Sequence, residues 1–93
     1  MAVDLHSRIM RNGDLMFIPL VEGIAMMDAD IGRYYALNEV AAAIWELMAS
    51  PVSGDTICAA LLERYEVTPE RCAEEVLAIL RTFEARGMLR VDA

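Results

Sequence analysis

A strand passes directly into a helix in the stretch RYYALNEVAAAIWELM, residues 33–48. The two tyrosines near its beginning favour a strand over residues 33–37. Asn38 follows at the position where a helix N-cap belongs. The apolar residues after it recur at the spacing of one helical face: Val40, Ile44, Leu47 and Met48. We therefore expect a helix that runs to about Ala49.

Two further strands are predicted before this stretch. The segment Leu15 to Val21 is apolar and contains Pro19, which is typical of a short edge strand. A second apolar segment, Ile24 to Met27, follows a turn and is itself followed by the turn-forming residues 28–32. Together with residues 33–37, these segments predict three short antiparallel strands.

Two further helices are predicted after residues 33–48. Ser50 and Pro51 end the first helix, and Ser53 can cap a second that ends near Tyr65. Thr68 can cap a third helix over Pro69 to Arg86, because proline is favoured at the first helical position and Gly87 suits the position after the end. Residues 88–91 can add a short final strand.

This order of elements predicts an α+β fold of the winged helix-turn-helix type, with a three-stranded antiparallel sheet followed by three helices. The 93 residues fit a single domain, residues 1–93, whose ordered core we expect to span about residues 14–91. There is no internal repeat and no linker rich in glycine or serine.

The composition restricts the classes of partner. A net charge of −7 and a pI near 4.5 repel phosphate backbones, which disfavours nucleic acid. Residues 1–11 lack a continuous apolar run, so we predict neither a signal peptide nor a membrane span, and a cytoplasmic protein. The hydrophobic fraction of 57% and the seven methionines suggest apolar surface beyond the needs of one core, and therefore a protein or peptide partner.

The sequence offers no group of residues suited to catalysis. His6 is the single histidine and lies in an N-terminal segment that we expect to be mobile, so no cysteine-histidine or serine-histidine pair is predicted. Cys58 and Cys72 fit core positions as reduced thiols, and too few ligands are available for a metal. Asp28 and Asp30 are read as turn residues. We predict no catalytic residue, no metal and no cofactor.

Two features instead predict a peptide-binding groove. Nothing in the sequence covers the free edge of the strand at residues 33–37, and an uncovered edge can accept an added peptide strand. The apolar arc of the third helix is about 160° wide, more than the ~100° that a core contact needs. One flank of the helix is therefore available to line the groove, either the flank of Ile79 or the opposite flank of Ala73 and Leu77. A helix buried on both flanks fits the same pattern.

From these two features we predict the following peptide-binding residues: Ile31, Gly32, Arg33, Tyr34, Tyr35, Ala36 and Leu37 on the strand, and Cys72, Glu75, Val76, Ile79 and Leu80 on the helix. Val76, Ile79 and Leu80 are expected to form the apolar wall, with Cys72 and Glu75 at its margin.

The same residues resemble a known family. The matching residues are the run Gly32 to Glu39, the run Ala43 to Leu47, and the positions Ile57, Leu61, Tyr65, Val76, Leu80, Phe83, Gly87 and Leu89. Their order and spacing resemble the PqqD-like proteins, also called RiPP recognition elements, over about residues 14–91. The tyrosine pair that leads into an isoleucine-tryptophan helix looks most like the stand-alone members found beside lasso-peptide precursors.

The resemblance implies a non-enzymatic protein. It implies a winged helix-turn-helix fold whose third strand and third helix bind the leader segment of a ribosomally made precursor peptide. It also implies two separate partners, a cysteine-protease-like leader peptidase and a macrocyclising enzyme.

Two alternatives from other classes remain. The chain can be a permanent non-catalytic subunit of a larger enzyme, held by its apolar surface. It can also be a winged-helix DNA-binding regulator, although acidic residues outnumber basic ones in the predicted third helix.

Overall fold

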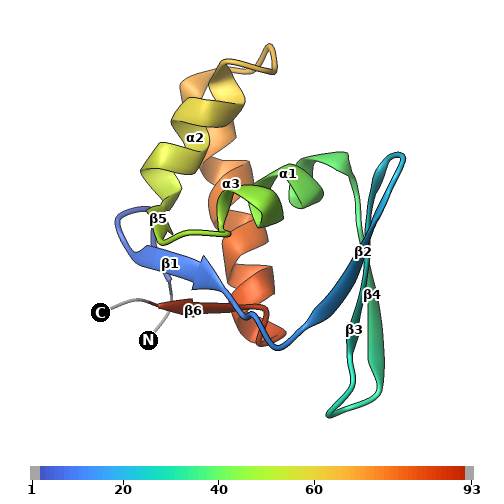
Figure 1. Cartoon of the computed structure of the whole chain (residues 1–93). Helices are drawn as coiled ribbons and strands as arrows, with labels where there is room; N and C mark the ends of the chain where they lie inside the picture. Colours follow the sequence, from blue (N-terminus) through green and yellow to red (C-terminus); the bar gives the residue numbers. More distant parts are fainter. Residues whose placement is uncertain (1–2, 92–93) are drawn as a thin grey trace.

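The computed structural model describes residues 3–91 and contains two small antiparallel sheets packed beside three helices (Figure 1). The elements are β1 (Arg8–Arg11), β2 (Met16–Leu20), β3 (Gly23–Asp28), β4 (Arg33–Leu37), α1 (Glu39–Leu47), β5 (Val52–Ser53), α2 (Gly54–Leu62), α3 (Pro69–Ala85) and β6 (Leu89–Val91). The predicted α+β fold, with a three-stranded sheet followed by three helices, is confirmed.

The three predicted strands form the sheet β2-β3-β4, in which β2 and β4 are the edges. The antiparallel register pairs Phe17 with Met26 and Met26 with Tyr35. Gly23 opens β3 at φ 151°, and a Cβ there would lie 2.0 Å from the carbonyl oxygen of Leu37. Only glycine, which has no Cβ, lets the start of β3 lie this close to the end of β4.

Side-chain caps set the beginning of each helix as the sequence predicts. Asn38 Oδ1 accepts a hydrogen bond from the backbone N–H of Ala41 at 2.9 Å, and Ser53 and Thr68 cap α2 and α3 in the same way. Two predicted ends were too late. α1 ends at Leu47 rather than about Ala49, and α2 ends at Leu62, so Tyr65 lies in the loop that follows.

A second sheet, with strand order β5-β1-β6, was not predicted. The predicted last strand is present as β6, but it pairs with β1, where Ile9 is opposite Val91. Val3 and Ile9 are buried, so the core includes residues that precede the expected range of about 14–91. Gly54 lets this N-terminal segment pack closely against the start of α2, because a Cβ at that position would lie within 3.0 Å of Leu5.

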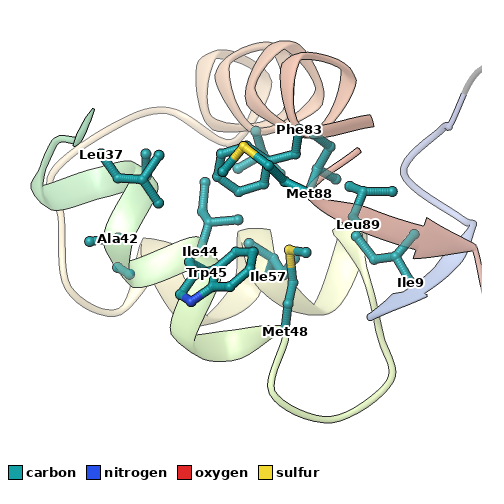
Figure 2. Close-up of a cluster of buried hydrophobic side chains, with 14 of the residues drawn as sticks. Ile9, Leu37, Ala42, Ile44, Trp45, Met48, Ile57, Phe83, Met88 and Leu89 are labelled. Atoms are coloured by element: carbon teal, nitrogen blue, oxygen red, sulfur yellow. The ribbon is translucent and has the colours of Figure 1, made fainter. Parts of the chain in front are cut away.

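The core lies between the helices and the inner faces of both sheets. Figure 2 shows the part of it where Trp45 and Ile44 meet Phe83 and Ile57. Trp45 of α1 is fully buried and makes edge contacts with Phe17 of β2 and Phe83 of α3, with ring centroids 5.7 and 6.3 Å away. These two contacts tie the sheet and the third helix to α1. Because β2 and β4 belong to the same sheet, these contacts also help to place the sheet that carries β4 beside α3.

Candidate functional site

The free edge of β4 is the first part of the candidate site. β4 pairs with β3 on one side only, and no strand within residues 3–91 pairs with its other side. Arg33, Tyr34 and Ala36 are exposed, Tyr35 is half-buried and Leu37 is buried. The edge therefore leaves backbone N–H and C=O groups available for another extended chain.

A groove runs between this edge and α3. It has a volume of about 220 Å³ and is lined from the sheet side by Ala36, Leu37 and Asn38, from α1 by Ala41, and from α3 by Ala78, Ile79, Thr82, Phe83 and Arg86. At one end, the guanidinium of Arg86 lies 5.0 Å from the centroid of the Tyr35 ring.

A second, smaller cavity lies further along the same helix face. Its volume is about 140 Å³, and its lining is apolar except for Glu75: Val40, Leu61, Tyr65, Val67, Cys72, Glu75, Val76 and Ile79. Ile79 lines both this cavity and the groove. The two hollows are therefore adjacent on α3, on the Ile79 side of the helix.

The structure places some of the predicted residues at the two hollows and leaves others away from them: Ala36, Leu37 and Ile79 line the groove. Val76 and Leu80 are fully buried in the core, and Cys72 is nearly so. Cys72 and Val76 line the small cavity, whereas Leu80 lines neither hollow. Ile31 and Gly32 lie in the exposed turn before β4. Ile79 is thus the predicted wall residue that reaches the groove itself.

Four groove residues on the α3 side were missed: Ala78, Thr82, Phe83 and Arg86. Phe83 belongs to the core-facing arc of the helix. The other three lie outside the apolar arc, because two are polar and the third is small. They lie on the same flank as Ile79 at 100° per residue, so helical geometry together with a fixed position of β4 would have found them. Glu75 lines the small cavity but not the groove, and Arg71 Nε lies 3.3 Å from its Oε1.

The single histidine and the two cysteines each have a structural partner or a buried position. His6 is exposed, with Nδ1 2.7 Å from Oδ2 of Asp55. Cys72 donates a weak hydrogen bond from Sγ to the Cys58 carbonyl oxygen at 3.8 Å. Partial burial and the nearby Cys72 raise the pKa of the Cys58 thiol to about 11, which keeps it protonated at neutral pH.

Residues 3–91 contain no group of three or more histidine, cysteine, aspartate or glutamate side chains placed to hold a metal ion. None of the helices in that range is both long and apolar enough to cross a membrane.

Comparison with known proteins gives one family and a set of similar structures. Residues 23–89 match the family model described as coenzyme PQQ synthesis protein D, PqqD. A comparison with curated protein sequences finds no match.

Three solved structures share the fold. The first, TbiB1 in complex with the TbiA(beta) leader peptide, has a TM-score of 0.81 at 18% identity, covering 90% of this chain and 98% of that one. The second, lasso peptide synthetase B1 complexed with the leader peptide, has a TM-score of 0.78 at 21% identity. The match covers 88% of this chain and 96% of that one. The third is the PqqD truncation of Methylobacterium extorquens PqqCD, described as a stand-alone RiPP recognition element. It has a TM-score of 0.78 at 14% identity, and the match covers 96% of this chain and 95% of that one.

Proposed function

The chain belongs to the PqqD family, and on that premise we propose that it binds the leader segment of a ribosomally made precursor peptide. The observation that carries the proposal is the free edge of β4 beside the groove on α3. The precursor we favour is that of a lasso peptide, because two proteins of the same fold are described in complex with leader peptides, one of them as a lasso peptide synthetase component.

The leader would lie antiparallel to Arg33–Leu37 as a fourth strand of the sheet. Added strands gain affinity from backbone hydrogen bonds, which do not depend on sequence. Alternate side chains of a strand point to opposite faces. One set would therefore enter the groove beside Ile79 and Phe83, while the other would point outward beside Tyr34 and Ala36.

Selectivity for particular leaders would come from the two hollows on α3. The small cavity has room for one aliphatic side chain, and its apolar lining would favour such a residue over a polar one. Glu75 at its margin would favour a nearby basic residue in the leader over an acidic one. The groove itself offers the Thr82 hydroxyl as its polar group on the helix side.

We propose that the role is presentation rather than catalysis. The nucleophilic thiol nearest the groove is Cys72, which is nearly fully buried, and the single histidine hydrogen-bonds Asp55 on another surface. A separate leader peptidase and a macrocyclising enzyme would carry out the chemistry. The encounter would take place in the cytoplasm, where ribosomal products are released.

Backbone NMR with a synthetic leader tests the binding mode. The probe is a synthetic leader peptide of a lasso precursor, titrated into the full chain labelled with ¹⁵N. The expected result is a set of saturable shifts at the amides of residues 31–37 and along the Ile79 side of α3. Saturable binding that leaves the amides of β4 unmoved would overturn strand addition, and the absence of binding would overturn leader recognition.

A further inference from the structure

A third hollow, which we call the outer hollow, lies on the sheet β2-β3-β4 and is separate from the two on α3. Its volume is about 550 Å³, and residues of all three strands line it. Phe17 points toward Trp45 in the core, so its neighbours along β2 point away from the helices. Figure 1 shows the helices on one side of this sheet. The outer hollow is lined mainly by side chains of the other face: Met16, Ile18, Ala25, Met27, Tyr34 and Ala36.

The strand register explains the shape of the outer hollow. Ala25 of β3 is directly opposite Ala36 of β4, and Ile18 of β2 is opposite Ala25 on its other side. The next outward row contains the larger pair Met27 and Tyr34. The two alanine methyl groups therefore form a low floor, with Met27 and Tyr34 along one side and Ile18 at the far end.

The outer hollow opens at the strand edge where the leader is proposed to bind. Ala36 lines both the outer hollow and the groove on α3. It belongs to β4, whose second edge pairs with no strand within residues 3–91. Successive side chains of a strand added there would point alternately toward the groove and toward the outer hollow. The outer hollow is thus continuous with the proposed leader site.

We propose that the outer hollow binds one large apolar side chain of the leader, preferably an aromatic one, at the outward position opposite Ala36. The inference rests on the proposed function, because the leader supplies the added strand. Directly opposite residues of antiparallel strands have Cβ atoms about 4.5–5.5 Å apart, and diagonal neighbours about 7–8 Å apart are within reach of aromatic and long side chains. Such a side chain would cover the Ala36 methyl group and extend toward Ala25, with Tyr34 as its diagonal neighbour.

The lining determines which side chain the outer hollow would accept. It contains no charged residue, so a charged side chain would lose hydration without gaining a partner. Ile18 and Tyr34 are more than half exposed, and an apolar side chain beside them would remove part of this surface from water. A small side chain would leave the alanine floor uncovered. The leader would therefore be recognised on both faces of its strand.

Size and charge favour a single side chain over a whole protein as the occupant. A stable protein interface needs about 800 Å² on each partner, whereas one side chain needs only the floor and its walls. A second copy of this chain would bring another charge of −7, so the two copies would repel each other.

The test varies the floor and the leader side chain together. The probe is a synthetic leader peptide of a lasso precursor that shifts the β4 amides. Intermolecular NOEs between backbone protons identify its residue opposite Ala36, and two versions carry phenylalanine or alanine there. Ala25→Leu fills the floor at a residue that does not line the groove. Ala59→Leu is the matched control, because it adds the same atoms at an exposed position of α2.

We expect the wild-type chain to bind the phenylalanine version at least fivefold more tightly than the alanine version. Ala25→Leu should weaken binding of the phenylalanine version at least fivefold and of the alanine version less than twofold, while Ala59→Leu changes both less than twofold. If Ala25→Leu fails to fold, the smaller change Ala25→Val, which favours a strand, should weaken the phenylalanine version at least twofold. In the wild-type chain with ¹³C-labelled alanine methyl groups, those of Ala25 and Ala36 should show NOEs to the phenylalanine ring.

Other results separate the two hypotheses. If the leader does not bind, or binds without shifting the β4 amides, the proposed function fails and this inference with it. If the leader pairs with β4 but Ala25→Leu behaves like Ala59→Leu and the ring NOEs are absent, the outer subsite alone is overturned. Equal affinity for the two leader versions also overturns it. Self-association of the empty wild-type chain that Ala25→Leu abolishes would instead assign the outer hollow to a second copy.

Discussion

The guanidinium of Arg86 lies over the ring of Tyr35, 5.0 Å from its centroid, and so joins the C-terminal end of α3 to the free edge strand. Arg86 is the C-cap of the helix, and Tyr35 is the central residue of β4. The contact crosses one end of the groove. It links the edge strand directly to the end of the helix.

Removing this contact should weaken leader binding. We expect Arg86→Gln to reduce leader affinity about three- to tenfold, because exposed cation–π contacts contribute about 0.5–1 kcal/mol and the arginine also lines the groove. Arg81→Gln is the matched control, since Arg81 is exposed on α3 and lines neither hollow. Fluorescence anisotropy with a labelled leader measures both. Equal affinities of the two variants would contradict a role for Arg86.

Ile79 should be the main apolar contact on the helix. Replacing it by aspartate should weaken leader binding by about 1–3 kcal/mol, because Ile79 lines both hollows and its replacement puts a charge against an apolar peptide side chain. Ala73→Asp places the same charge on the opposite flank and should leave affinity nearly unchanged. Calorimetric titration of both, with thermal unfolding as a folding control, distinguishes the flanks. The reverse order of affinities would move the site to the Ala73 and Leu77 flank.

Gly23 should be essential for stability in a way that Gly13 is not. A Cβ at residue 23 meets the Leu37 carbonyl oxygen at 2.0 Å, and its φ of 151° is rarely adopted by other residues. We expect Gly23→Ala to lower the free energy of unfolding by about 2 kcal/mol or more. Gly13→Ala meets no atom within 4 Å and should change it by less than about 0.5 kcal/mol. Urea unfolding followed by tryptophan fluorescence gives both values, and equal losses would contradict this contact.

The Cys58 thiol should react slowly in the folded protein. Its pKa of about 11, against a usual 9.0, lowers the thiolate fraction at pH 8 about 100-fold, although the more basic thiolate is intrinsically more nucleophilic. A net slowing of about tenfold relative to urea-unfolded protein is expected. The rate should keep rising with pH up to about 11, because the thiol loses its proton only there. A disulfide reagent applied to the wild-type chain, with the modified cysteine identified by peptide mapping, measures Cys58 while Cys72, which helps to raise its pKa, stays in place. A rate that levels off near pH 9 would contradict the raised pKa.

If the chain presents the leader to an enzyme, it should change the rate of leader removal only when that enzyme is present. The chain alone should leave the precursor unchanged. Added to the leader peptidase, it should accelerate leader removal, because a bound leader has a high effective concentration near the partner's active site. A precursor that lacks the part of its leader expected to pair with β4, but keeps the cleavage site, should show no acceleration. Chromatography of the cleavage products follows the rate. Cleavage by this chain alone, in proportion to its concentration, would contradict a non-enzymatic role.

Much of the fold could be predicted from local signals in the sequence. β4 begins and ends at the predicted residues, and Asn38 and Thr68 cap the helices as expected. The family prediction is confirmed by the match over residues 23–89. These signals are local, since a cap or a short strand depends on neighbouring residues.

The parts that could not be predicted depend on distant contacts. β1 and β5 are four and two residues long, and their pairing joins segments more than forty residues apart, so no local pattern marks them. Helical periodicity placed Leu80 and Ile79 in one apolar arc but could not tell which of them faces β4. Thr82 and Arg86 needed the position of β4 before their place in the groove could be seen.

The pairing of Ile9 with Val91 has a consequence for how the chain can be joined to other proteins. β1 and β6, the first and last strands that the structure describes, lie side by side, and Figure 1 shows them at the opposite end of the molecule from β4. A tether attached at either end would therefore leave the edge of β4 unobstructed. Gene fusion to an enzyme at either terminus, or circular permutation across this pair, should be compatible with an open groove.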